Sequence, residues 1–130
     1  MQLGYTILYV ASVPETMAFY ERAFGLERGM LAPGDVYGEM ATGATKLGFS
    51  AVEFARTLHG VAFEPAAAGG SAPPVELALV TDTVEAAFER ATAAGAVAVK
   101  APEHKPWGQL VAYVRDNNGF LVEICSPVAG

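Results

Sequence analysis

The stretch that decides the fold of this chain is WGQLVAYVRDNNGFLVEICSP, Trp107–Pro127. Residues 109–115 alternate in the manner of a strand and are rich in Val and Tyr. Residues 116–119, DNNG, are turn formers that tolerate left-handed backbone, and a strand resumes over residues 120–125. The stretch therefore predicts a β-hairpin.

The second strand of this hairpin has two unlike faces. Phe120, Val122 and Ile124 share one face, which is uniformly apolar and is expected to cover a core. The opposite face carries Glu123 between apolar neighbours, where a concave sheet would present a ligand or a catalytic group. The alternative is that Glu123 simply lies on a solvated face.

The hairpin also carries a family resemblance. Its pattern, W-G-x-x-V-A-Y-V-R-D-x-x-G-x-x-V-E, resembles the last hairpin of the vicinal oxygen chelate superfamily. That superfamily holds glyoxalase I, extradiol dioxygenases, fosfomycin-resistance transferases and bleomycin-type resistance proteins. The resemblance implies that Glu123 matches a position that is commonly the final metal ligand.

Composition bounds the class of protein. The 130 residues suit one domain with a proper core, and 52% hydrophobic with 17% charged residues is typical of a globular chain. A net charge of −6 argues against a nucleic-acid or anionic-membrane partner. The single cysteine, Cys125, excludes an intrachain disulfide. Without a signal-peptide pattern or an apolar run of membrane-spanning length, we expect a cytoplasmic protein.

The first half of the chain predicts a strand, a helix and a meander. Ser12 is the expected helix N-cap and Gly25 the expected C-terminal stop. The expected elements are, in order, a strand over 3–10, a helix from Ser12 to Phe24, a loop over 28–35, and strands over 36–41 and 46–51.

The second half repeats the first. Its expected elements are a strand over 75–80, a helix capped by Asp82 or Thr83 and running to Ala94, a strand over 96–100, and the hairpin. When the two halves are aligned, Tyr5 corresponds to Glu76, 71 residues later, and Gly48 falls near the position of Glu123, 75 residues later. The resemblance implies an α+β fold of two βαβββ modules in one domain, forming a cup-shaped mixed sheet with helices outside. We assign module one to residues 1–52, a linker to 53–74 and module two to 75–130.

The linker holds two features besides its Pro/Gly/Ala-rich tail. Residues 53–60 are expected to form a short helix, and residues 61–63 an apolar flap. The linker is either a plain connector or a lid over the site.

This sequence does not retain the set of metal-ligating residues that is common in the superfamily. The resemblance places its four ligand positions at Tyr5, roughly Gly48, Glu76 and Glu123, and only Glu123 has a usual ligand type. Metal sites of this kind generally need three or more suitable protein ligands. We therefore predict no metal, no cofactor and no catalytic residue. The two histidines, His59 and His104, lie outside the predicted cup strands.

What remains is an aromatic cup with a few polar groups, suited to a flat, apolar and, as one option, cationic organic molecule. Inward tyrosines that merely fill a collapsed pocket, or form a dimer seam, are the alternative. The predicted ligand-binding residues are Tyr5, Tyr9, Tyr37, Glu39, Phe63, Glu76, Trp107, Gln109, Tyr113 and Glu123.

These observations favour a metal-independent protein of the bleomycin-resistance type, which sequesters an aromatic small molecule or antibiotic without transforming it. The resemblance implies a homodimer. One alternative is a glyoxalase- or dioxygenase-type enzyme whose metal is held by Glu76, Glu123 and a loop histidine. Another is a metal-free isomerase or cyclase that uses Glu76 and Glu123 for acid/base work. A purely structural or regulatory role is the third.

Overall fold

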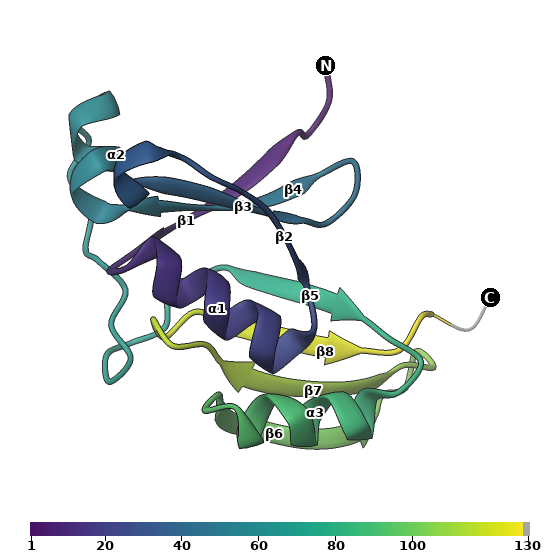
Figure 1. Cartoon of the computed structure of the whole chain (residues 1–130). Helices are drawn as coiled ribbons and strands as arrows, with labels where there is room; N and C mark the ends of the chain where they lie inside the picture. The colour runs from purple at the N-terminus through teal and green to yellow at the C-terminus, as the bar shows by residue number, and fades with distance from the viewer. Residues whose placement is uncertain (129–130) are drawn as a thin grey trace. The chain divides into compact units, whose positions relative to one another are not determined.

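The computed structural model describes residues 1–128 and shows an α+β protein whose chain divides into two compact units, residues 1–66 (unit 1) and the chain from Ala67 onward (unit 2) (Figure 1). The elements of unit 1 are β1 (Tyr5–Val10), α1 (Val13–Phe24), β2 (Glu27–Leu31), the 3-10 turn η1 (Pro33–Asp35), β3 (Tyr37–Ala41), β4 (Lys46–Ala51) and α2 (Val52–His59). Those of unit 2 are β5 (Glu76–Val80), α3 (Val84–Ala93), β6 (Val97–His104), β7 (Leu110–Arg115) and β8 (Leu121–Cys125).

Each unit contains one four-stranded mixed sheet with the same connectivity. The strand orders are β1-β4-β3-β2 and β5-β8-β7-β6. In each unit the first strand runs parallel to the last strand of that unit, and the remaining pairs are antiparallel. The predicted pair of βαβββ modules is therefore confirmed. That the two sheets together form one cup stays a prediction.

The strand registers repeat as well as the strand order. The residue pairs at matching places are Ile7–Gly48 and Glu39–Gly48 in unit 1, and Ala78–Glu123 and Tyr113–Glu123 in unit 2. Gly48 and Glu123 thus hold the same position on the fourth strand of their modules, as the sequence spacing predicted.

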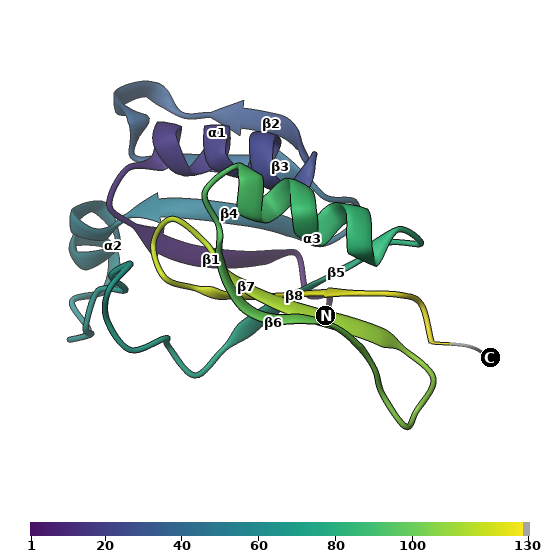
Figure 2. The ribbon, with the colours of Figure 1, turned by 90° about the horizontal axis from the view of Figure 1, so that it is seen from below.

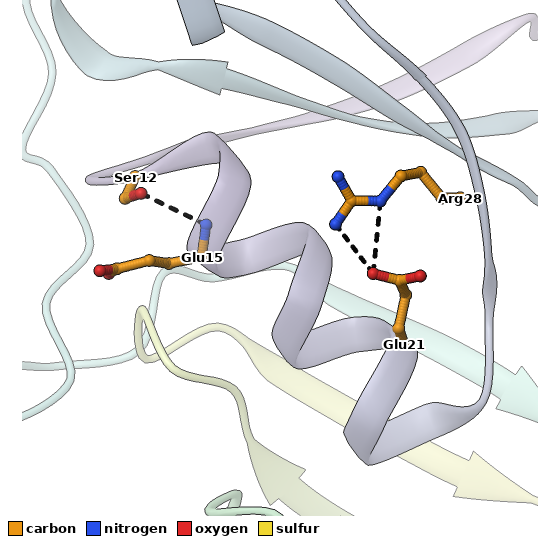
Figure 3. Close-up of polar contacts among 4 residues, drawn as sticks. All are labelled: Ser12, Glu15, Glu21 and Arg28. Carbon is orange, nitrogen blue, oxygen red and sulfur yellow. Dashed lines mark hydrogen bonds and ion pairs between the residues drawn. The ribbon is translucent and has the colours of Figure 1, made fainter.

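Helix α1 begins and ends where its sequence indicates. The Ser12 side chain accepts a hydrogen bond from the backbone N–H of Glu15 at 3.3 Å, which satisfies one free donor of the first turn (Figure 3). Gly25 ends the helix in left-handed backbone, with φ of 68°, a conformation that costs a glycine little. Its buried side Val13, Met17 and Tyr20 packs on the sheet of unit 1.

A glycine lets α1 approach this sheet closely. Gly38 on β3 lies under Met17 and Val13, and an added methyl group would overlap the Met17 sulfur. The matching residue of β7 in unit 2 is Ala112, which is fully buried beneath α3. This position therefore requires a glycine in unit 1, whereas unit 2 accommodates a methyl group there. Figure 2 shows α1 alongside β2 and β3.

The loop predicted over residues 28–35 is wrong for its first half, since Glu27–Leu31 forms the edge strand β2. The sequence ERGML is poor in β-branched residues, and a bulge between Arg28 and Met30 disturbs the alternation. Pairing with β3 and an ion pair of 2.8 Å between Arg28 and Glu21 of α1 hold it in place (Figure 3).

The hairpin of β7 and β8 forms as predicted. Asp116 Oδ1 accepts the backbone N–H groups of Asn118 at 2.8 Å and Phe120 at 2.9 Å, and Gly119 takes a φ of 91°. One boundary in unit 2 differs from expectation, because β6 runs on to His104. Thr83 holds the N-cap position of α3, as predicted, although its side chain contacts Thr81 and makes no cap bond.

The short helix expected over 53–60 is confirmed as α2, which ends at Gly60 in left-handed backbone. None of the helices formed by residues 1–128 is both long and apolar enough to cross a membrane.

Candidate functional site

The sheet of unit 1 has an open face opposite α1. Because side chains alternate along a strand, Leu8 and Val10 of β1 are buried toward α1, while Tyr5, Ile7 and Tyr9 point the other way. Helix α2 directly follows β4 and packs against β1 and β4 at one end of the sheet. A pocket of about 100 Å³ lies there, lined by Ile7, Tyr9, Tyr37, Ser50, Phe54, Ala55, Leu58 and His59.

Three aromatic rings gather at this pocket. The centroid of Tyr9 lies 5.9 Å from that of His59, in a stacked arrangement, and 5.0 Å from that of Phe63. The His59 and Phe63 centroids are 6.1 Å apart, and the Arg56 guanidinium lies 5.3 Å from the Phe63 centroid. The flap residue Phe63 is thus attached to the pocket rim through Tyr9 and α2.

Both ring nitrogens of His59 have partners. Its Nδ1 accepts the backbone N–H of Val61 at 2.9 Å, and its Nε2 lies 3.2 Å from the Tyr9 hydroxyl oxygen. A neutral imidazole whose Nδ1 accepts carries its proton on Nε2. His59 therefore donates to Tyr9.

Tyr37 occupies the space that Gly48 leaves. A Cβ atom at position 48 would lie 2.6 Å from the Tyr37 hydroxyl oxygen, so no side chain fits there without displacing Tyr37. The hydroxyl donates to Glu39 Oε2 at 2.7 Å. Burial, then the hydrogen bond and charge of Glu39, raise the pKa of Tyr37 well above its ordinary value. Tyr37 is therefore a neutral phenol at physiological pH.

Unit 2 gathers acidic and hydroxyl groups at the matching place. Tyr113 donates to Glu123 Oε1 at 3.0 Å, and Glu76 lies within hydrogen-bond reach of Glu123. Burial and the neighbouring Glu123 raise the pKa of Glu76, raise that of Tyr113 to about 12, and raise that of the Cys125 thiol to about 11. Cys125 is therefore an inert thiol at neutral pH.

The remaining predicted residues of unit 2 form a separate pair. Trp107 Nε1 donates to Gln109 Oε1 at 2.6 Å, and Gln109 Nε2 donates to the backbone oxygen of Ser126 at 2.9 Å. Trp107 is 59% exposed, so its ring is available to a partner rather than buried.

The metal that the fold family implies does not fit the residues present. The four ligand positions supply a 54%-exposed phenol (Tyr5), a glycine covered by Tyr37 (Gly48), and the carboxyl groups of Glu76 and Glu123. Within residues 1–128, no three His, Cys, Asp or Glu side chains cluster so as to hold a metal ion. His59 is engaged at both nitrogens, and His104 lies in β6 opposite Leu110.

The structure thus groups part of the predicted set. In unit 1 it brings Tyr9 to Phe63 and Tyr37 to Glu39, with Tyr9 and Tyr37 both lining the pocket. Tyr5 lies outside the lining. In unit 2, Glu76, Tyr113 and Glu123 meet, and Trp107 meets Gln109. That the two groups serve one ligand stays a prediction.

Sequence reasoning missed the α2 side of the pocket. Ala55, Leu58 and His59 are three and four residues apart, so a helix over 53–60 places them on one face. That spacing was a usable signal in the sequence for the α2 side of the pocket.

One comparison with known proteins identifies a family. The family model of the glyoxalase/bleomycin resistance protein/dioxygenase superfamily matches residues 2–124. A comparison with curated proteins found no significant match.

Solved structures with the same fold cover nearly the whole chain. A glyoxalase/bleomycin resistance protein/dioxygenase family enzyme from Burkholderia phytofirmans PsJN is 25% identical, with a TM-score of 0.84 over 99% of this chain and 100% of that one. A glyoxalase-related enzyme from Fulvimarina pelagi is 23% identical, with a TM-score of 0.83 over 98% and 88%. TioX from Micromonospora sp. ML1 is 23% identical, with a TM-score of 0.72 over 97% and 98%.

Proposed function

The chain belongs to the glyoxalase/bleomycin resistance protein/dioxygenase superfamily, and we propose that it binds an aromatic small molecule without a metal, as a sequestering protein of the bleomycin-resistance type. The observation that carries this proposal is the pocket between the open face of unit 1 and α2. Its walls combine aromatic rings with aliphatic side chains, the lining that organic ligands favour.

The place of Tyr37 supports the metal-independent part. A side chain at position 48 would have to share space with the Tyr37 hydroxyl. That hydroxyl donates a hydrogen bond to Glu39, the residue that pairs with Gly48 on the neighbouring strand β3. The Glu39 carboxylate is therefore already engaged by Tyr37. In unit 1, the Tyr37 ring therefore fills the position where the superfamily commonly has a metal-ligating side chain.

Metal analysis and a ligand screen together test the proposal. We expect elemental analysis of protein purified without chelators to find much less than one metal per chain, before and after soaking in Zn, Mn, Ni and Fe(II). One tightly held metal per chain would overturn the metal-independent reading.

The second part is an NMR screen of single-ring and fused aromatic compounds against methyl-labelled protein. We expect shifts at Ile7 and Leu58, which line the pocket, and loss of the Ile7 shift in Leu58→Trp, where the indole fills the pocket. Leu3→Trp is the matched control, because Leu3 is exposed and lies outside the lining. Shifts that survive Leu58→Trp would place binding elsewhere.

A metal-free proton transfer at Glu76 and Glu123 is the second candidate, favoured by their contact and by the raised pKa of Glu76. It predicts solvent-deuterium incorporation into a bound carbonyl compound, lost in Glu123→Gln. A ligand recovered without deuterium supports binding alone.

We further propose that the protein is a cytoplasmic homodimer, on the strength of the drug-binding relatives that the sequence resembles. Sedimentation equilibrium at several concentrations tests the assembly, with a mass of twice 13.6 kDa as the expected result. A monomer at all concentrations would contradict it.

A further inference from the structure

We propose that the pocket of unit 1 selects an uncharged aromatic ring bearing a hydrogen-bond acceptor, such as a carbonyl oxygen, and that the Tyr9 hydroxyl, oriented by His59, is the donor that recognises it. This inference rests on the proposed function and deepens it by naming the chemical class of the ligand.

The first step is the proton position on His59. Val61 belongs to the flap, and its backbone N–H points at His59 Nδ1 at 2.9 Å. The neutral ring must then carry its hydrogen on Nε2. The flap thus determines the tautomer of a residue in the pocket wall.

The second step is the direction of the Tyr9 hydroxyl. His59 Nε2–H donates to the Tyr9 oxygen at 3.2 Å, so the hydroxyl hydrogen cannot be directed at His59. Across residues 1–128, Tyr9 has no other hydrogen-bond partner, although its side chain lines the pocket. Its hydrogen is therefore the group left for a ligand acceptor.

The third step excludes the other hydroxyl groups of the lining as hydrogen-bond donors to a ligand. Tyr37 donates its hydrogen to Glu39, and Ser50 Oγ donates to the backbone oxygen of Ala51 at 3.2 Å. The rest of the lining is aliphatic or Phe54. Since no Asp, Glu, Lys or Arg lines the pocket, a charged ring would lose its hydration without an ion partner.

The fourth step concerns size. An apolar cavity of about 150 Å³ is large enough to bind benzene. The pocket of about 100 Å³ is smaller than that, so it takes at most part or all of one ring, with the remainder of a larger ligand outside it.

Two isosteric probes test the inference. Acetophenone carries a carbonyl oxygen, and α-methylstyrene has the same shape with a CH₂ group in its place. We expect Tyr9→Phe to weaken acetophenone binding about threefold to tenfold, the range for one neutral hydrogen bond, and to leave α-methylstyrene affinity unchanged. Dissociation constants come from titrations that follow the methyl groups of Ile7 and Leu58.

Thr6→Val is the matched control, because it also removes one hydroxyl group from β1, at a residue outside the lining. It should change neither affinity. His59→Phe keeps a ring against Tyr9 and Phe63 but removes the donor, so we expect it to weaken acetophenone selectively, by about twofold to threefold. An equal effect on both probes would reduce His59 to a packing role and overturn its part as the positioning residue.

The outcomes separate the inference from the proposed function. Binding of both probes with no selective effect of Tyr9→Phe would overturn the inference and leave metal-free aromatic binding standing. Failure of wild-type protein to bind either probe up to the solubility limit would count against the pocket as a ligand site, and the inference would fall with it.

Discussion

Units 1 and 2 have the same strand order and register, yet they place opposite chemistry at matching positions. On the fourth strand, unit 1 has Gly48 where unit 2 has Glu123. On the first strand, Tyr5 corresponds to Glu76. The duplicated backbone thus holds a neutral aromatic pocket in one unit and a carboxyl cluster in the other.

A tyrosine-to-glutamate hydrogen bond occurs in both units but with different geometry. Tyr37 and Glu39 lie on one strand, β3, two residues apart, while Tyr113 of β7 donates across to Glu123 of β8. In unit 1 the phenol crosses over Gly48, and in unit 2 the neighbouring strand supplies the acceptor itself. The fold sets the positions, and the side chains on them decide whether the result is a pocket wall or an acidic site.

The largest effect is expected from a substitution that gives unit 1 the glutamate of unit 2 at the matching position. Gly48→Glu places a side chain within the space of Tyr37 and a second carboxylate beside Glu39, so we expect it to lower the free energy of unfolding by about 3 kcal/mol. Urea unfolding measures the effect. Gly4→Glu is the control, because open space surrounds Gly4, and adding Tyr37→Ala to Gly48→Glu should recover part of the loss. A loss below about 0.5 kcal/mol would show that Tyr37 moves aside freely.

The second test asks whether unit 2 contributes to ligand binding. If Trp107 stacks on the ligand, Trp107→Ala should weaken the best ligand of the screen by about 1–3 kcal/mol, while Trp107→Phe should retain most of the affinity. Isothermal calorimetry checks both variants. Unchanged affinity in Trp107→Ala would confine the site to unit 1.

The third test concerns the Tyr113–Glu123 hydrogen bond. Tyr113→Phe should lower the free energy of unfolding by about 1 kcal/mol near neutral pH, the usual value of such a bond. The pKa of Tyr113 is raised from 10.0 to about 12, so its contribution is complete below 10.0 and is lost as pH rises toward 12. The stability difference between wild type and variant, followed by chemical unfolding across that window, should shrink with rising pH. A constant difference would contradict the hydrogen bond.

The smallest effect is expected at Glu76. Its raised pKa means that its ionised form is disfavoured in the fold, so Glu76→Gln should stabilise the protein at neutral pH, by only about 0.3 kcal/mol because the group is exposed. The gain should vanish as pH falls below the ordinary value of 4.5, where the native carboxyl is protonated. Thermal unfolding at both ends of the range tests it. Destabilisation at neutral pH would mean that Glu76 has a favourable partner.

Much of the fold was predictable because its signals are local. Ser12 and Gly25 delimit α1 through groups three or four residues away, and the turn before Phe120 is closed by Asp116 at its start. Strand β2 was not predictable, since ERGML becomes a strand only by pairing with β3. Two of the eight residues that line the pocket, Tyr9 and Tyr37, were foreseen, and the α2 side was not.

The sequence by itself determined the duplication, the hairpin, the helix limits and the poverty of metal ligands, because each depends on residue type and spacing alone. Only the tertiary structure decided that Tyr37 covers Gly48, that α2 closes the pocket, and that His59 meets Tyr9, 50 residues earlier in the chain. Such contacts depend on how far each strand and helix extends and where the chain turns back. A side chain's role in a site is therefore settled by what the folded backbone brings beside it.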